Sequence, residues 1–60
     1  MNGFKFELHD KVLIDVSLEC GMIIGRAEYA DSVNNYLIRY KTADGRAVEN
    51  WWSENAITHQ

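Results

Sequence analysis

Residues 36–52 read YLIRYKTADGRAVENWW, and this stretch decides the fold. Apolar side chains recur at every second position on both sides of Asp44-Gly45, as expected for two strands that each bury one face. Glycine accepts the positive φ that tight hairpin turns require, so Asp44-Gly45 is the strongest hairpin signal in the chain. The stretch therefore predicts an antiparallel hairpin.

The same period of two continues outward from this hairpin, and helical spacing is not sustained anywhere for three turns. Ser53 is a suitable cap for a single 3₁₀ turn after the hairpin. Gly25 is expected to let the strand that contains it bend. The predicted strands cover residues 4–8, 11–16, 22–29, 36–41 and 46–51, with a short closing piece at 56–58.

This order of elements is typical of small SH3-like barrels. We predict one all-β domain over residues 1–60, a five-stranded SH3-like (Tudor-like) barrel with one 3₁₀ turn before the last strand. Residues 1–9 are expected to form a loosely attached first strand, and residues 59–60 a frayed end. Phe4 or Phe6 is expected to cover one end of the core. The predicted inward side chains are Val12, Ile14, Ile23, Ala27, Tyr36, Ile38, Tyr40, Val48, Trp52 and Ile57.

Composition favours a small protein of a reducing compartment. The chain has 60 residues and one cysteine, Cys20, which cannot form an internal disulfide. Residues 1–10 lack the continuous apolar stretch of a signal peptide, and the longest aliphatic run, residues 22–24, is far below the roughly 20 residues that span a bilayer. The expectation is a cytoplasmic protein that does not enter a membrane.

The chain offers little for metal, cofactor or catalytic chemistry. Cys20, His9 and His59 lack the spacing of metal ligands, and His59 lies near the end of the chain. Gly21 and Gly25 do not form a phosphate-cradling loop. We therefore predict no catalytic residue, no cofactor and no metal site, with Cys20 as a bystander in a loop before Gly21.

Surface residues give the clues to binding. Successive strand residues point to opposite faces, so Trp52 is assigned to the core and Trp51 to the outside, beside Glu49. An exposed tryptophan is a large rigid surface that contributes strongly when a partner buries it. Three cations, Arg26, Arg39 and Lys41, also occupy positions predicted to face outward. They form either a basic stripe that binds nucleic acid or a solvated face of cross-strand ion pairs. The predicted binding residues are Trp51, Glu49, Arg39, Arg26 and Tyr29.

Four further outward positions are aliphatic, and they come from three consecutive predicted strands. If they cluster, they form an apolar patch suited to self-association as a homodimer. The alternative is a bulge near Gly25 that shifts the register and returns some of them to the core. The four residues are Leu13, Met22, Ile24 and Leu37.

Residues 21–57 contain Gly-Arg-Ala-Glu-Tyr, Tyr-Leu-x-Arg-Tyr and Glu-x-Trp-Trp, and in these pieces the chain resembles small uncharacterised proteins encoded by bacteriophages and prophages. The resemblance implies a phage or bacterial context and a bacterial host cytoplasm. It assigns no activity to any residue.

A looser similarity, in architecture and in the spacing from Asp10 to Ile23, is to the plasmid-type dihydrofolate reductases, which are tetrameric SH3-like barrels. That family lines its pore with a Val-Gln-Ile-Tyr strand, whereas this chain has Val48-Glu49-Asn50-Trp51 at the corresponding place. The similarity therefore fails where the chemistry would take place.

Nine acidic and six basic side chains give a net charge of −3, which opposes non-specific attraction to nucleic acid. We predict a non-enzymatic protein-binding or adaptor module with an unidentified protein partner. The alternatives are a nucleic-acid-binding barrel and an enzyme assembled only in an oligomer.

Overall fold

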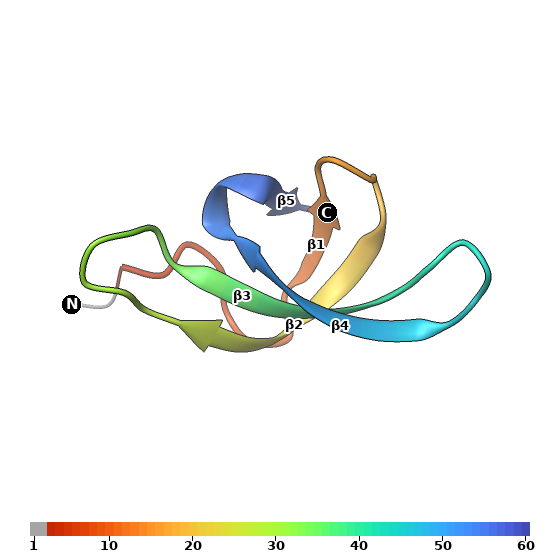
Figure 1. The fold of residues 1–60 in the computed structure, drawn as a ribbon, viewed down its shortest axis with the longest axis horizontal. Helices are drawn as coiled ribbons and strands as arrows, with labels where there is room; N and C mark the ends of the chain where they lie inside the picture. The colour runs from red at the N-terminus through yellow and green to blue at the C-terminus, as the bar shows by residue number, and fades with distance from the viewer. Residues whose placement is uncertain (1–2) are drawn as a thin grey trace.

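The computed structural model describes residues 3–60, and it is an all-β fold built on one five-stranded antiparallel sheet (Figure 1). A single 3₁₀ turn, η1, precedes the last strand, as the sequence predicted. The elements are β1 (Lys11–Ile14), β2 (Cys20–Ala27), β3 (Asn35–Lys41), β4 (Ala47–Ser53), η1 (Glu54–Ala56) and β5 (Ile57–His59).

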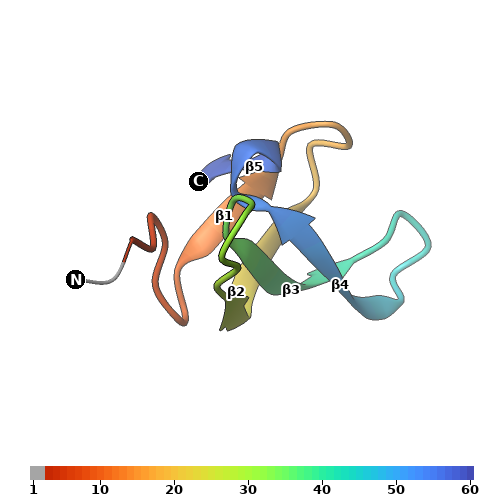
Figure 2. The same ribbon diagram turned by 60° about the vertical axis from the view of Figure 1, so that its left-hand side comes forward.

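The strand order is β4-β3-β2-β1-β5, so β1 pairs with both β2 and β5. The two views show a strongly twisted sheet, in which β1 and β5 lie on one side of β2, and β3 and β4 on the other (Figures 1 and 2). Over residues 3–60, no strand ladder joins β4 to β5, so the sheet is open rather than closed by hydrogen bonds into a barrel.

The hairpin between β3 and β4 forms as predicted. Lys41 pairs with Ala47, and Gly45 has a φ of 88°, the left-handed conformation that glycine adopts without strain. The N–H of Gly45 donates to the carbonyl of Thr42 at 2.9 Å. At the other end of β4, Ser53 occupies the N-cap position of η1 but makes no side-chain cap bond. The N–H of Glu54 donates instead to the carbonyl of Asn34 at 2.9 Å.

One face of the sheet carries the core, and most of the predicted inward side chains are in it. Val48 and Trp52 are partly buried and pack against this cluster. Phe6, which was one of two candidates for covering the core, is fully buried, and Phe4 is partly buried. The buried cluster consists of Phe6, Val12, Ile14, Ile23, Tyr36, Ile38, Tyr40 and Ile57.

A bulge in β2 changes the facing of its last residues. Ile23 pairs with Ile38, but the next pair on β3 joins Gly25 to Leu37, so Ile24 is an extra residue. The two residues after the bulge therefore exchange faces. Arg26, predicted to face outward, lies opposite the buried Tyr36, and Ala27, predicted to face inward, lies opposite Asn35 and is not buried.

The segment before β1 is not the strand that was predicted for residues 4–8. It is held by a side chain instead: the N–H groups of Lys5 and Phe6 donate to the Tyr36 hydroxyl at 3.0 and 3.3 Å. Arg26 Nη1 donates to the Phe6 carbonyl at 3.2 Å. The N–H groups of Lys5 and Phe6 are thus bound by a side chain rather than by a neighbouring strand.

Residues 59–60, for which fraying was expected, make backbone contacts with β1. His59 pairs with Val12 in the β1–β5 ladder, and its ring lies 4.5 Å from the centroid of the Phe6 ring. The N–H of Gln60 donates to the carbonyl of Lys11 at 3.1 Å. His59 is therefore part of β5, and Gln60 is bound to β1 just beyond the end of that strand.

Candidate functional site

The face of the sheet opposite the core, called here the outer face, carries an apolar row at its β4 edge. Trp51 pairs with Leu37, which in turn pairs with Gly25. A Cβ placed on Gly25 would lie 3.8 Å from Trp51 Cη2, so the indole extends over a backbone that has no side chain of its own. Trp51 nevertheless stays 52% exposed.

The two adjacent tryptophans lie on opposite faces, as the sequence predicted. Trp52 pairs with the buried Tyr36, and its ring lies edge-on to Tyr40 at 6.4 Å between centroids. The core thus uses Trp52, whereas Trp51 is left half-exposed on the outer face beside Glu49.

The next row of the outer face crosses four strands and contains three charged residues, so it is called here the charged row. Its members are paired in the order Glu49, Arg39, Met22 and Lys11. Arg39 donates from Nε and Nη2 to Glu49 Oε2 at 3.0 and 2.8 Å. Both side chains of this pair are largely exposed, so its contribution to stability is small.

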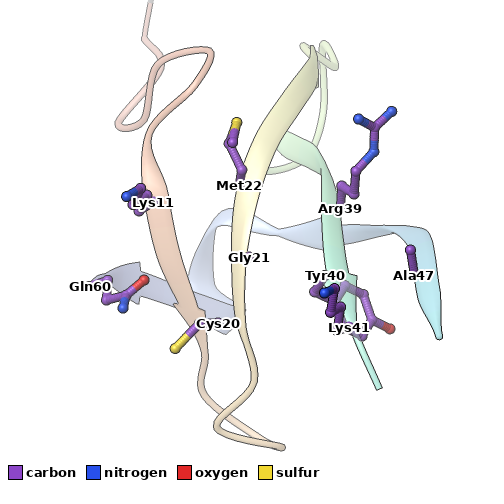
Figure 3. Close-up of a pocket in the computed structure, with 9 residues that line it drawn as sticks. All are labelled: Lys11, Cys20, Gly21, Met22, Arg39, Tyr40, Lys41, Ala47 and Gln60. Atoms are coloured by element: carbon purple, nitrogen blue, oxygen red, sulfur yellow. The ribbon is translucent and has the colours of Figure 1, made fainter. Parts of the chain in front are cut away.

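An open pocket of about 450 Å³ lies on this part of the outer face (Figure 3). Three of its lining residues are cations, Lys11, Arg39 and Lys41, which come from β1 and β3. Figure 3 shows these side chains on both sides of Met22 and Gly21 on β2, with Ala47 of β4 beyond Lys41. The remaining lining residues are Cys20, Tyr40 and Gln60.

Of the predicted binding residues, the structure brings together Trp51, Glu49 and Arg39. Arg26 does not belong to this group, because it faces the other side of the sheet, where its guanidinium lies 4.4 Å from the centroid of the Phe4 ring. Tyr29 is exposed, but it lies beyond the end of β2 at Ala27. The basic stripe of Arg26, Arg39 and Lys41 is therefore not formed.

The four residues predicted for self-association do not share one row. Leu37 pairs with Gly25 in the apolar row, and Ile24 is the bulged residue beside it. Leu13 pairs with Cys20, so the charged row that contains Met22 lies between Leu13 and Leu37. The bulge near Gly25, which was the alternative to an apolar patch, is present, but it returns none of the four to the buried core. Leu13, Ile24 and Leu37 are half-buried and Met22 is exposed.

Cys20 is the first residue of β2 rather than part of a loop, and its side chain is exposed. No basic residue was expected near Cys20, yet it lines the same pocket as Lys11, Arg39 and Lys41. That Cys20 is dispensable for folding stays a prediction.

A second polar cluster lies at the end of the core near η1. The Tyr36 hydroxyl donates to Glu54 Oε1 at 2.5 Å while it accepts the two N–H bonds of the N-terminal segment. This bond lowers the pKa of Glu54, because it stabilises the carboxylate. Burial, followed by the same bond to Glu54, raises the pKa of Tyr36. Every group is paired, so the cluster is a structural latch rather than a reactive site.

Two further features are absent from the part of the chain that the structure describes. Across residues 3–60, no group of three or more His, Cys, Asp or Glu side chains is arranged to hold a metal ion. No helix in that range is long and apolar enough to cross a membrane.

Lys11 and Gln60 are among the lining residues of the pocket that the sequence did not identify as binding residues. Both belong to strand neighbours that are distant in sequence, because Lys11 pairs with Met22 and its carbonyl accepts from Gln60. Successive residues of a strand point to opposite faces, so the sequence already indicated that Lys11 faces outward when Val12 faces the core. Its position beside Met22 depends on the register of the β1–β2 pair, which no turn motif specifies.

Comparison of the chain with protein-family models, with curated proteins and with solved structures finds no match.

Proposed function

We propose that the protein is a non-enzymatic binding module that recognises another protein through the outer face of its sheet. The observation that carries the proposal is the exposure of Trp51. Its neighbour Trp52 already packs against the core, so the fold does not require a second large aromatic side chain at this edge.

The surroundings of Trp51 support this reading. Leu37 and the bare backbone of Gly25 extend the apolar surface, and the Arg39–Glu49 pair gives it a polar border. A buried aromatic anchor surrounded by polar groups is the usual arrangement of a binding hot spot. Trp51, Glu49 and Arg39 are therefore the proposed contact residues.

We further propose that the open sheet is a variant of the SH3-like barrel. The order β4-β3-β2-β1-β5, the bulged β2 shared between two groups of strands, and η1 before β5 support this assignment. A role as an adaptor in the cytoplasm of a bacterial host, encoded by a phage or prophage, rests on the resemblance of residues 21–57 alone.

Nucleic-acid binding is the second candidate, and the cations around the outer-face pocket are the observation that favours it. The net charge of −3 and the opposite facing of Arg26 oppose it, since polyanion binding needs several cations along one track. Two further proposals rank below these candidates. They are enzymatic activity in an oligomer and self-association through Leu13, Met22, Ile24 and Leu37.

The test is selection of displayed random 12-residue peptides on the immobilised protein, with Trp51→Phe and Trp52→Phe as matched variants. We expect peptides that bind the wild type to lose at least about fivefold in affinity on Trp51→Phe, because the indole dominates the contact. A folded Trp52→Phe should retain them. Failure of any peptide to bind the wild type better than Trp51→Phe would contradict the proposed function.

A further inference from the structure

We infer that the outer-face pocket binds an acidic, extended segment of the partner protein, with carboxylates held by Lys11, Arg39 and Lys41. This inference rests on the proposed function and adds the chemistry of the partner. It places a second contact beside Trp51, on the same face of the sheet.

The charge around the pocket differs from that of the chain as a whole. The chain has six lysines and arginines and nine acidic residues, yet three of those cations and no acidic side chain line the pocket. Glu49, which pairs with Arg39 across β3 and β4, does not line the pocket and is bound to Arg39 in an ion pair. In residues 3–60, the structure gives Lys11 and Lys41 no carboxylate partner. An acidic segment would supply the missing counter-charges.

The shape and the remaining lining favour a peptide. Lys11 lies on β1, and Arg39 and Lys41 lie on β3, so the cations flank the central strand β2 (Figure 3). Between them lie Met22 and Gly21, and Ala47 lies at the β4 side. A segment with acidic side chains and one aliphatic side chain matches this combination of flanking charge and small apolar surface.

Nucleic acid fits the same observations less well. The cations are gathered around one pocket, whereas a strand of nucleic acid needs a track that follows several phosphates. Lys5, Arg26 and Arg46, which would have to extend such a track, do not line the pocket.

The experiment uses the same displayed 12-residue peptides and two variants that lose equal charge. The pocket variant is Lys11→Gln/Lys41→Gln, and the control is Lys5→Gln/Arg46→Gln, which removes two exposed cations outside the pocket. We expect wild-type-selected peptides to be enriched in Asp and Glu. By fluorescence anisotropy, they should bind the pocket variant about tenfold more weakly, and the control less than about twofold more weakly.

Cys20 provides an independent readout at the pocket itself. Its exposed thiol is the only one in the chain, so its reaction with 4,4′-dithiodipyridine, an uncharged disulfide, reports on this place alone. A saturating selected peptide should slow that reaction at least about fivefold in the wild type. Unchanged reactivity with the peptide bound would overturn the inference.

The outcomes separate the inference from the proposed function. Peptides that depend on Trp51 but are not acidic, or that bind the pocket and control variants equally, overturn the inference and leave the function standing. Tighter binding of a 12-nucleotide oligothymidylate, lost in the pocket variant and falling steeply with salt, overturns the inference in favour of nucleic acid. Failure of all peptides to distinguish wild type from Trp51→Phe removes the proposed function as well.

Discussion

The two faces of the sheet differ in how completely their side chains are buried and hydrogen-bonded. On the inner face, Val12, Ile38 and Tyr36 are fully buried, and the tyrosine hydroxyl has several hydrogen-bond partners. On the outer face, Trp51 and Met22 remain exposed, with an ion pair at the surface nearby. The difference indicates that changes on the inner face should cost stability, whereas changes on the outer face should cost binding.

The largest effect is expected at Gly21, which faces inward from β2. A Cβ at this position would lie 2.5 Å from Ile38 Cγ2 and 2.9 Å from the Arg39 carbonyl oxygen, so β3 would have to move. We expect Gly21→Ala to reduce the free energy of unfolding by about 2–3 kcal/mol, measured by urea denaturation.

Gly3→Ala is the matched control, because a Cβ on Gly3 would meet nothing within 4 Å. Its free energy of unfolding should stay within about 0.5 kcal/mol of the wild type. If Gly21→Ala were equally mild, the close approach of β2 and β3 at this point would be wrong.

A smaller loss is expected from Tyr36→Phe. The ring stays in the core, but the Phe6 N–H loses its acceptor and Glu54 loses a donor. The Lys5 N–H keeps only Glu54 Oε1, at 3.2 Å. We expect a loss of about 1–2 kcal/mol in the free energy of unfolding, with faster amide exchange at Phe6. Tyr29→Phe, at an exposed ring, should change the free energy by less than about 0.5 kcal/mol; equal losses in both variants would exclude the latch.

The same latch predicts a modest dependence of stability on acid. Glu54 has a folded-state pKa below its ordinary value of 4.5, because the Tyr36 hydroxyl donates to it. The unfolded state therefore binds the proton more readily, so this contribution is complete above about pH 4.5 and is lost as the pH falls through the lower folded-state pKa. Urea midpoints between pH 7 and pH 3 should fall less steeply in Tyr36→Phe than in the wild type. Identical slopes would contradict this role of Glu54.

The alternation of apolar and polar residues predicted which side chains face the core and which face outward, but only where the strand register was regular. The Asp44-Gly45 turn fixes the β3–β4 pairing, and from it follows the opposite facing of Trp51 and Trp52. Beyond Ile23 the prediction failed, because one extra residue in β2 reverses every later side chain. Gly25 signalled that a bend was possible, although it did not say which residue would be inserted.

The candidate site was predicted less completely than the core. Trp51, Glu49 and Arg39 lie on strands joined by a short hairpin, so local reasoning was enough to group them. The pocket combines residues from β1, β2, β3 and β4 with Gln60, and its assembly depends on the non-local pairing of β1. The attachment of Phe6 through the Tyr36 hydroxyl is likewise a long-range side-chain contact that no periodicity encodes.

The most direct test of the division between the faces is a paired measurement on Trp51→Phe and Trp52→Phe. For each variant, urea denaturation gives the free energy of unfolding, and fluorescence anisotropy gives the affinity for a peptide selected on the wild type. Trp52→Phe should lose about 1 kcal/mol of stability and keep its affinity, because lost packing against Tyr40 outweighs removal of an unpaired buried Nε1. Trp51→Phe should keep its stability within about 0.5 kcal/mol and lose at least about fivefold in affinity. If Trp51→Phe instead destabilises the fold more than Trp52→Phe and leaves the affinity unchanged, the outer face is structural and the account is wrong.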